Sequence, residues 1–158
     1  MLNWLESTSI AVWLAESPSV WAMPTVLTLH TTGMAVLVGA SWLLDLRLLG
    51  INRNVPLSAY RWVFRAVALG LIVNLFTGVL LFMKNATTWG TALPFLVKML
   101  FVVASAATIL PIRKYVLNSG DGLSEATSLP NARLVAIVSI VAWTAAVTAG
   151  RLLAYLVP

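Results

Sequence analysis

The chain has no cysteine and only one histidine, His30, among its 158 residues. Without cysteine it has no disulfide, iron–sulfur ligation, thiolate metal site or covalent haem attachment through Cys-x-x-Cys-His. One histidine cannot complete the first shell of a zinc or copper site within one chain. The chain also lacks His-Glu-x-x-His, Gly-x-Ser-x-Gly and P-loop motifs, and it has five acidic residues in all. A hydrolase or a proton-coupled carrier therefore has few residues to use.

Apolar residues, by contrast, are abundant. Hydrophobic residues make up 60% of the chain and charged residues 9%, and the mean hydropathy is +0.93. This composition is typical of an integral membrane protein, and residues 1–158 have room for a single all-α domain. The net charge of +5 comes mostly from loops and helix ends, so it reflects membrane topology and gives no reason to expect nucleic acid as a partner.

Hydropathy predicts four transmembrane helices, because about 20 mainly apolar residues cross a bilayer core of ~30 Å. The expected spans are residues 21–46, 63–83, 93–112 and 134–156. Residues 1–17 are too short and too polar to span. Their apolar residues Trp4, Ile10, Trp13 and Leu14 can share one helical face, which predicts an interfacial amphipathic helix.

Cations concentrate at the connection between the first and second spans and at the connection between the third and fourth. The latter is a polar loop over residues 118–130. The cations that flank these two connections are Arg47, Arg53, Arg61, Arg65, Arg113, Lys114 and Arg133. The positive-inside rule therefore predicts that these two connections are cytoplasmic and that both termini lie outside.

Polar side chains at bilayer depth are costly, and each is a candidate functional residue. At 1.5 Å of rise per residue, His30 falls roughly 5 to 6 Å to the outer side of the midplane, Lys98 roughly 7 Å and Arg151 roughly 9 Å. Asn74 and Thr77 fall close to the centre. The four spans are thus expected to contribute to one polar layer in the outer half of the bundle.

The same residues also have a purely structural interpretation. His30 can bond to a neighbouring helix through a hydroxyl group, such as that of Thr28, or through a backbone carbonyl. Lys98 and Arg151 can extend along their flexible stems to the outer interface. Asn74 and Thr77 are more typical of hydrogen bonds between helices than of ligands.

Asp45 is the only acidic residue within or beside a main span. We expect it to pair with Arg47, Arg61 or Arg65 at the cytoplasmic edge, which is a structural role. Five glycines are most simply positions of close helix packing: Gly33, Gly39, Gly70, Gly78 and Gly150. Gly33 lies one turn from His30 and is also a place where a flat cofactor could enter.

One imidazole and two buried cations suit a b-type haem. Imidazole is a common axial ligand, the macrocycle fits between apolar helices, and cations pair with propionates. In this hypothesis His30 ligates iron, while Lys98 and Arg151 hold propionates. The second axial position is left open: it is vacant, or filled by His30 of a second copy, by Lys98, by Met34 or Met99, or by a partner's ligand.

The motif pattern resembles an uncharacterised family of four-helix bacterial membrane proteins over nearly the whole chain. The matching segments are His30 followed by Gly33 and Gly39, then 45–50 (DLRLLG), 74–82 (NLFTGVLLF) and 95–98 (FLVK). More distantly, this pattern is similar to the superfamily of copper-resistance membrane protein D and the haem-binding membrane protoporphyrinogen oxidase. The resemblance implies a multi-pass protein of the bacterial inner membrane, with His30 as the haem-associated ligand and Lys98 as its companion.

These observations favour a haem b electron-transfer or redox subunit near the periplasmic face, with a quinone or a periplasmic redox protein as electron partner. The residues expected to hold the cofactor are His30, Lys98, Arg151, Gly33, Asn74 and Thr77, with His30 as the metal ligand. A cofactor-free structural or assembly subunit of a larger membrane complex is the main alternative. A binder of an anionic lipid or small amphiphile is the third. The lone histidine also makes a homo-oligomer or a complex with another subunit an expected state.

Overall fold

The computed structural model describes residues 2–52, 54–118 and 131–156. Within these ranges all regular elements are helical. Four helices are long and apolar enough to cross a membrane: α3 (Ala22–Leu48), α4 (Val63–Lys84), α6 (Leu93–Asn118) and α7 (Ala132–Leu156). The predicted all-α class, with four helices that could span a membrane, is thereby confirmed. Arg53 and most of the polar loop predicted at 118–130 lie outside the described residues.

The spans begin close to their predicted positions, but α6 ends later. It continues through Pro111 and past the cations Arg113 and Lys114 to Asn118, whereas the apolar run ends at residue 112. Helical hydrogen bonding does not stop where the sequence becomes polar, so hydropathy underestimates a helix that extends beyond the bilayer. Pro24 interrupts nothing, because it lies in the first turn of α3, where its missing N–H has no intrahelical acceptor.

The N-terminal segment differs from the single amphipathic helix expected over residues 1–17. It forms two short helices, α1 (Leu2–Glu6) and α2 (Ser9–Glu16). Two side chains end α1: the Ser7 hydroxyl donates to the Trp4 carbonyl at 2.9 Å, and the Thr8 hydroxyl donates to that of Leu5 at 2.7 Å. Such local bonds compete with helix continuation.

The predicted shared apolar face is consequently divided. Leu14 is buried, and α2 contacts α4, whereas Trp4, Ile10 and Trp13 are more than half exposed. A further contact holds α1 on α5 (Ala86–Trp89), the short helix after α4. There the Glu6 carboxylate accepts from the Thr87 backbone N–H at 2.8 Å and from the Thr87 hydroxyl at 2.7 Å.

Gly50 ends α3 at the opposite end of the bundle. Its φ of 103° is in the left-handed region, which glycine enters without the penalty of a Cβ atom. The Gly50 N–H donates to the Arg47 carbonyl at 3.1 Å, and the Ile51 N–H donates to the Leu46 carbonyl at 3.0 Å. This is a Schellman motif. The chain then turns through the short helix η1 (Leu57–Tyr60) into α4.

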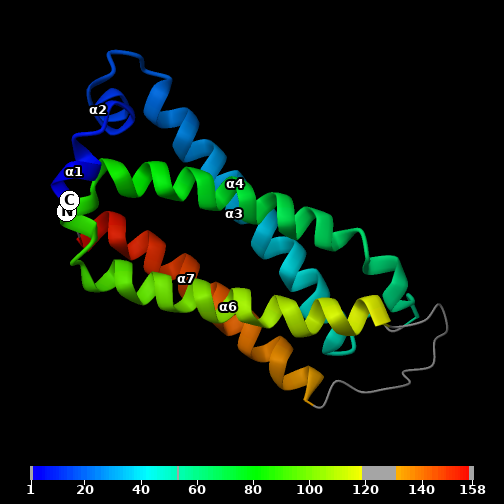
Figure 1. Cartoon of the computed structure of the whole chain (residues 1–158). Helices are drawn as coiled ribbons and strands as arrows, with labels where there is room; N and C mark the ends of the chain where they lie inside the picture. Colours follow the sequence, from blue (N-terminus) through cyan, green and yellow to red (C-terminus); the bar gives the residue numbers. More distant parts are fainter. Residues whose placement is uncertain (1, 53, 119–130, 157–158) are drawn as a thin grey trace.

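The long helices form two pairs, each contiguous in sequence. The most extensive contacts are those of α3 with α4 and of α6 with α7, and the two pairs meet mainly where α3 contacts α7. Figure 1 shows α3 crossing α4 obliquely and reaching α7 at the end where α7 begins. We call this the basic end, because it carries Arg47, Arg61, Arg65, Arg113, Lys114 and Arg133. The other end, with α1, α2 and the last turns of α7, is the terminal end (Figure 1).

The apolar core lies toward the basic end, where all four long helices contribute to it. Its buried members are Leu37, Val38, Leu44, Tyr60, Val63, Val67, Ile112, Val116 and Trp143. Many large apolar side chains remain on the outside of the helices, among them Leu69, Ile72, Phe76, Leu100 and Val141. Such surfaces are expected where lipid is the solvent. The core therefore joins the two pairs at the basic end.

Candidate functional site

His30 lies in α3 with 9% of its surface exposed, facing α4. Its Nδ1 is 2.9 Å from the Thr77 hydroxyl oxygen. The Thr77 hydroxyl is itself directed at the Val73 carbonyl, 2.7 Å away. A hydroxyl has one proton to donate. If this proton is donated to the Val73 carbonyl, the hydroxyl accepts a hydrogen bond from Nδ1–H of His30. A neutral imidazole in that tautomer would keep the lone pair of Nε2 for a ligand.

Asn74 holds the same two helices together one turn earlier in α4. Its side-chain amide donates to the backbone carbonyl of His30 at 2.9 Å. Asn74, Thr77 and Gly78 share one face of α4, since residues three and four apart are neighbours on a helix. The expectation that Asn74 and Thr77 make hydrogen bonds between helices is confirmed. The hydroxyl that bonds His30 is that of Thr77 on the neighbouring helix, and not that of Thr28.

Glycines allow this close approach of α3 and α4. A Cβ atom on Gly78 would be 3.3 Å from Cε1 of His30, so the imidazole lies directly on the α4 backbone. A Cβ atom on Gly33 would be 2.9 Å from a Val73 methyl carbon and 3.2 Å from the Asn74 nitrogen. The face of Gly33 is thus filled by α4. This corrects the expectation that a flat cofactor enters there: the role of Gly33 in the structure is helix packing.

Of the other predicted packing glycines, Gly70 is closely packed and Gly39 is not. A Cβ atom on Gly70 would be 2.7 Å from the Leu37 nitrogen, which confirms close packing of backbones at this position. Gly39 is exposed, and a Cβ atom there would meet nothing within 4 Å. The prediction of close packing is therefore wrong for Gly39, because periodicity alone does not show which side of a helix meets its partner.

Lys98 approaches the site from the other helix pair. Its side chain is half-buried on α6, and its stem lies along Gly150 of α7, with Cε 3.4 Å and Nζ 3.6 Å from an ideal Cβ at that glycine. The Lys98 ammonium is close enough to His30 to interact with it electrostatically. The structure thus brings together the two residues that sequence depth placed in one layer.

Arg151 has a different environment. Its side chain is exposed, although Gly150, the preceding residue, faces Lys98. Successive helical residues point about 100° apart, which turns Arg151 away from that contact. The predicted buried cluster of two cations therefore contains Lys98 but not Arg151.

Asp45 lies near the basic end of α3 and is 0% exposed. Neither of its carboxylate oxygens has a hydrogen-bond partner among the described residues. Arg47 is directed elsewhere, since its Nε donates to the Val55 carbonyl at 3.1 Å, and Arg61 and Arg65 are exposed. The predicted pairing of Asp45 with an arginine is therefore wrong. The short spacing in the sequence suggested that Asp45 lies close to an arginine, but its side chain faces α7.

Among the described residues, no three His, Cys, Asp or Glu side chains are grouped so as to hold a metal ion. A metal bound at His30 would thus need most of its ligands from a non-protein group such as a macrocycle. The described site contains one imidazole, which α3 carries and α4 binds, and one cation, which α6 carries beside α7. Comparisons with protein-family models, with curated proteins and with solved structures found no match to this chain.

Proposed function

We propose that this chain is a membrane-embedded haem b protein that transfers electrons, with His30 Nε2 as the axial ligand to iron. The observation that carries the proposal is the hydrogen-bonded series from His30 to Thr77 to the Val73 carbonyl. Histidines that bind metals usually donate their other ring N–H to a protein acceptor, which fixes the tautomer and the orientation of the ring.

Lys98 supplies a cation near His30 for an anionic edge of the bound group. His30 belongs to the α3–α4 pair and Lys98 to the α6–α7 pair, and α4 and α6 have at most marginal contact among the described residues. Lys98 would pair with a propionate, as cations do with carboxylates. Arg151, being exposed, is not required for this. Haem, when bound, supplies one-electron redox chemistry, and the chain orients the imidazole and shields it from water.

Under the orientation expected from the cations, the site lies in the outer half of the membrane. A quinone or a periplasmic redox protein is then the electron partner. Because the chain has one histidine, a second protein ligand to the haem would come from another copy of the chain or from another residue type.

The experiment is a visible spectrum of the protein purified in detergent from haem-supplemented cells. We expect a Soret band and reducible alpha and beta bands in the wild type. His30→Gly should lose them, and added imidazole should restore them by occupying the space of the lost side chain. Thr31→Ala, next to His30 but exposed, is the matched control and should keep the spectrum.

A colourless wild-type protein from the same cells would refute the haem proposal. It would favour the cofactor-free subunit, in which His30, Asn74 and Thr77 serve only to join α3 and α4. In that case, mass spectrometry of co-purified lipid before and after Lys98→Ala distinguishes a binder of anionic amphiphiles from a purely structural subunit.

A further inference from the structure

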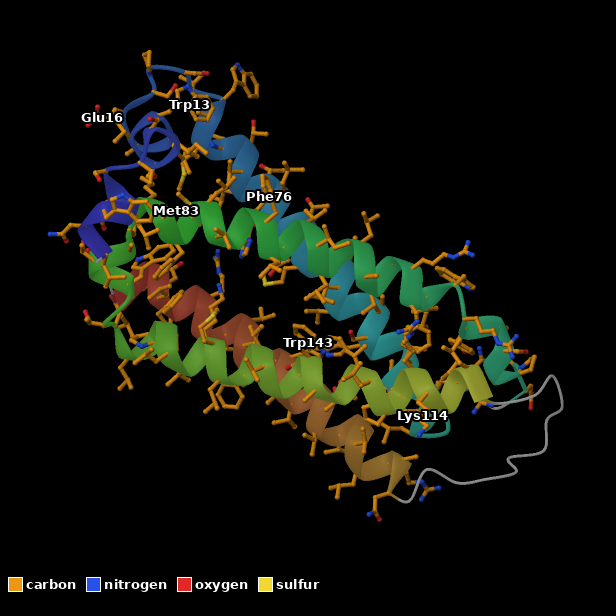
Figure 2. The ribbon with its side chains drawn as sticks, viewed as in Figure 1. Trp13, Glu16, Phe76, Met83, Lys114 and Trp143 are labelled. Carbon is orange, nitrogen blue, oxygen red and sulfur yellow. The ribbon has the colours of Figure 1, made fainter. Side chains whose placement is uncertain are left out.

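Two buried polar side chains, Asp45 and Ser139, face each other where α3 contacts α7, apart from the His30 site, and Trp143 is buried nearby on α7. Asp45 on α3 is 0% exposed and Ser139 on α7 is 1% exposed, and the two side chains face each other without forming a hydrogen bond shorter than 3.5 Å. Trp143 follows Ser139 by one turn, on the same face of α7, and is 3% exposed. Figure 2 shows Trp143 directed into the interior of the bundle. Its Nε1–H also has no partner among the described residues.

An ionised carboxylate in this position would be strongly destabilising. Removing a charge from water costs several kcal/mol even after relaxation, unless a counter-ion and hydrogen bonds compensate. Among the described residues, neither a cation nor a donor bonds to Asp45. Among the residues whose side chains the structure describes, the charged and titratable ones at this end are Arg47 on α3, Tyr60 and Arg61 at η1, Arg65 on α4, Arg113 and Lys114 on α6, and Arg133 on α7. Of these, only Arg47 and Tyr60 are buried.

A bound metal cation is poorly suited to compensate the charge of a buried Asp45 carboxylate. Hard cations take six or more oxygen ligands, whereas the described residues hold no group of three carboxylate, histidine or cysteine side chains. Trp143 presents an N–H, which is a donor only and repels a cation. A protonated carboxyl group needs neither a counter-ion nor a metal ion. It is neutral, it donates through its O–H, and it accepts through its C=O.

We propose that Asp45 is a proton-binding site within the membrane-spanning part of the protein, occupied at neutral pH and filled from the basic end. Asp45 lies one turn from the end of α3, so water at the basic end is the nearer source of the proton that converts the carboxylate to the neutral acid. Ser139 is the neighbouring hydroxyl on α7 that interacts with the acid. This inference does not depend on haem, since the Asp45 site shares no residue with the His30 site.

The test is infrared spectroscopy of the protein reconstituted into lipid at neutral pH. We expect a C=O stretching band of a protonated carboxylic acid in the wild type. Asp45→Asn, which keeps the size of the side chain, should remove this band. Glu16→Gln, at an exposed position on α2, should leave it unchanged and is the matched control.

Ser139→Ala keeps the carboxyl group and should shift the frequency of the band without abolishing it. This variant also tests the assignment if Asp45→Asn does not fold. The absence of an acid band in the wild type at neutral pH would overturn the proposal. A band that persists in Asp45→Asn, or one that does not move in Ser139→Ala, would do so as well.

Discussion

At the scale of the residue, the tautomer of His30 depends on how the Thr77 hydroxyl is used. The hydroxyl lies between the imidazole and the Val73 carbonyl, and a proton donated to the carbonyl leaves its oxygen as an acceptor for Nδ1–H. We therefore expect Nδ1 to carry the proton. Because the chain contains one histidine, each ring nitrogen gives one signal in a spectrum of histidine-labelled protein.

Thr77→Val is expected to change the tautomer of His30 and to destabilise the protein. The valine keeps the shape but removes the acceptor, and a buried donor without a partner costs about 1–3 kcal/mol. Nitrogen NMR of labelled, cofactor-free protein should show Nδ1–H in the wild type and a population of Nε2–H in the variant. Thr77→Ser retains the hydroxyl and should preserve the wild-type spectrum. An Nε2–H tautomer in the wild type would contradict the assigned hydrogen bond.

The polar residues of this site could be predicted from sequence, but their pairing could not. Hydropathy gave the approximate depth of His30, Thr77 and Lys98, which correctly placed them near one another. Depth does not give the rotation of a helix about its own axis. Rotation is what directs Thr77 toward His30, turns Arg151 outward and points Asp45 at α7 instead of at an arginine. It is set by the packing of whole helices, for which the sequence offers only the weak signal of its small residues.

At the scale of the element, glycines set how closely α3 and α4 approach. The backbone of α3 at Leu37 lies against Gly70 of α4, and this contact leaves no space for a methyl group. Backbone atoms cannot move aside as a flexible side chain can, so an added carbon atom there would have to separate the helices.

Gly70→Ala is therefore expected to destabilise the protein by about 1–3 kcal/mol, the usual cost of overpacking. Gly39→Ala is the matched control, because a Cβ atom there meets nothing within 4 Å. It should be neutral or stabilising by about 0.5–1 kcal/mol through helix propensity. Thermal unfolding in detergent measures both variants. Equal effects at the two positions would contradict the close contact at Gly70.

The contact of α1 with α5 is a second feature at the scale of the element, and it depends on pH. The Thr87 hydroxyl, and then the Thr87 backbone N–H, lower the pKa of the Glu6 carboxyl below its ordinary value of 4.5. The ionised form is thus the one that α5 binds. A carboxyl group with a lowered pKa stabilises the folded state above its ordinary pKa, and this stabilisation is lost as the pH falls through the lowered value.

We expect the protection of α1 amides from hydrogen exchange, taken relative to the intrinsic exchange rate at each pH, to fall in acid below the ordinary pKa of Glu6. Glu6→Gln should remove this dependence on pH, because the amide does not titrate in this range. Glu16→Gln is the control and should behave as the wild type. Mass spectrometry of the N-terminal peptide provides the measurement. Unchanged protection in acid would show that Glu6 does not hold α1 on α5.

At the scale of the whole molecule, the two ends of the bundle differ in charge. The basic end carries the clustered arginines and Lys114 (Figure 2), while α1, α2 and α5 lie at the terminal end. The positive-inside rule predicts that the basic end faces the cytoplasm. The absence of cysteine allows this orientation to be measured without first removing any native thiol.

Single cysteines at Ala59 and Thr88, both exposed and at opposite ends, are expected to react from opposite sides of the membrane. A membrane-impermeant maleimide applied to intact cells should label Thr88→Cys and not Ala59→Cys. Permeabilised cells should label both, which controls for access. Labelling of Ala59→Cys in intact cells would reverse the orientation and place the His30 site in the cytoplasmic half.

The arrangement of the helices into two pairs, each continuous along the chain, also bears on how the protein is made. Chains emerge from the ribosome N-terminus first, so α3 and α4 are synthesised before α6 and can pack together as soon as both are in the bilayer. The bond from His30 to Thr77 lies wholly within this first hairpin. Both partners of this bond therefore reach the bilayer before Lys98 does, and insertion of the second hairpin adds the cation.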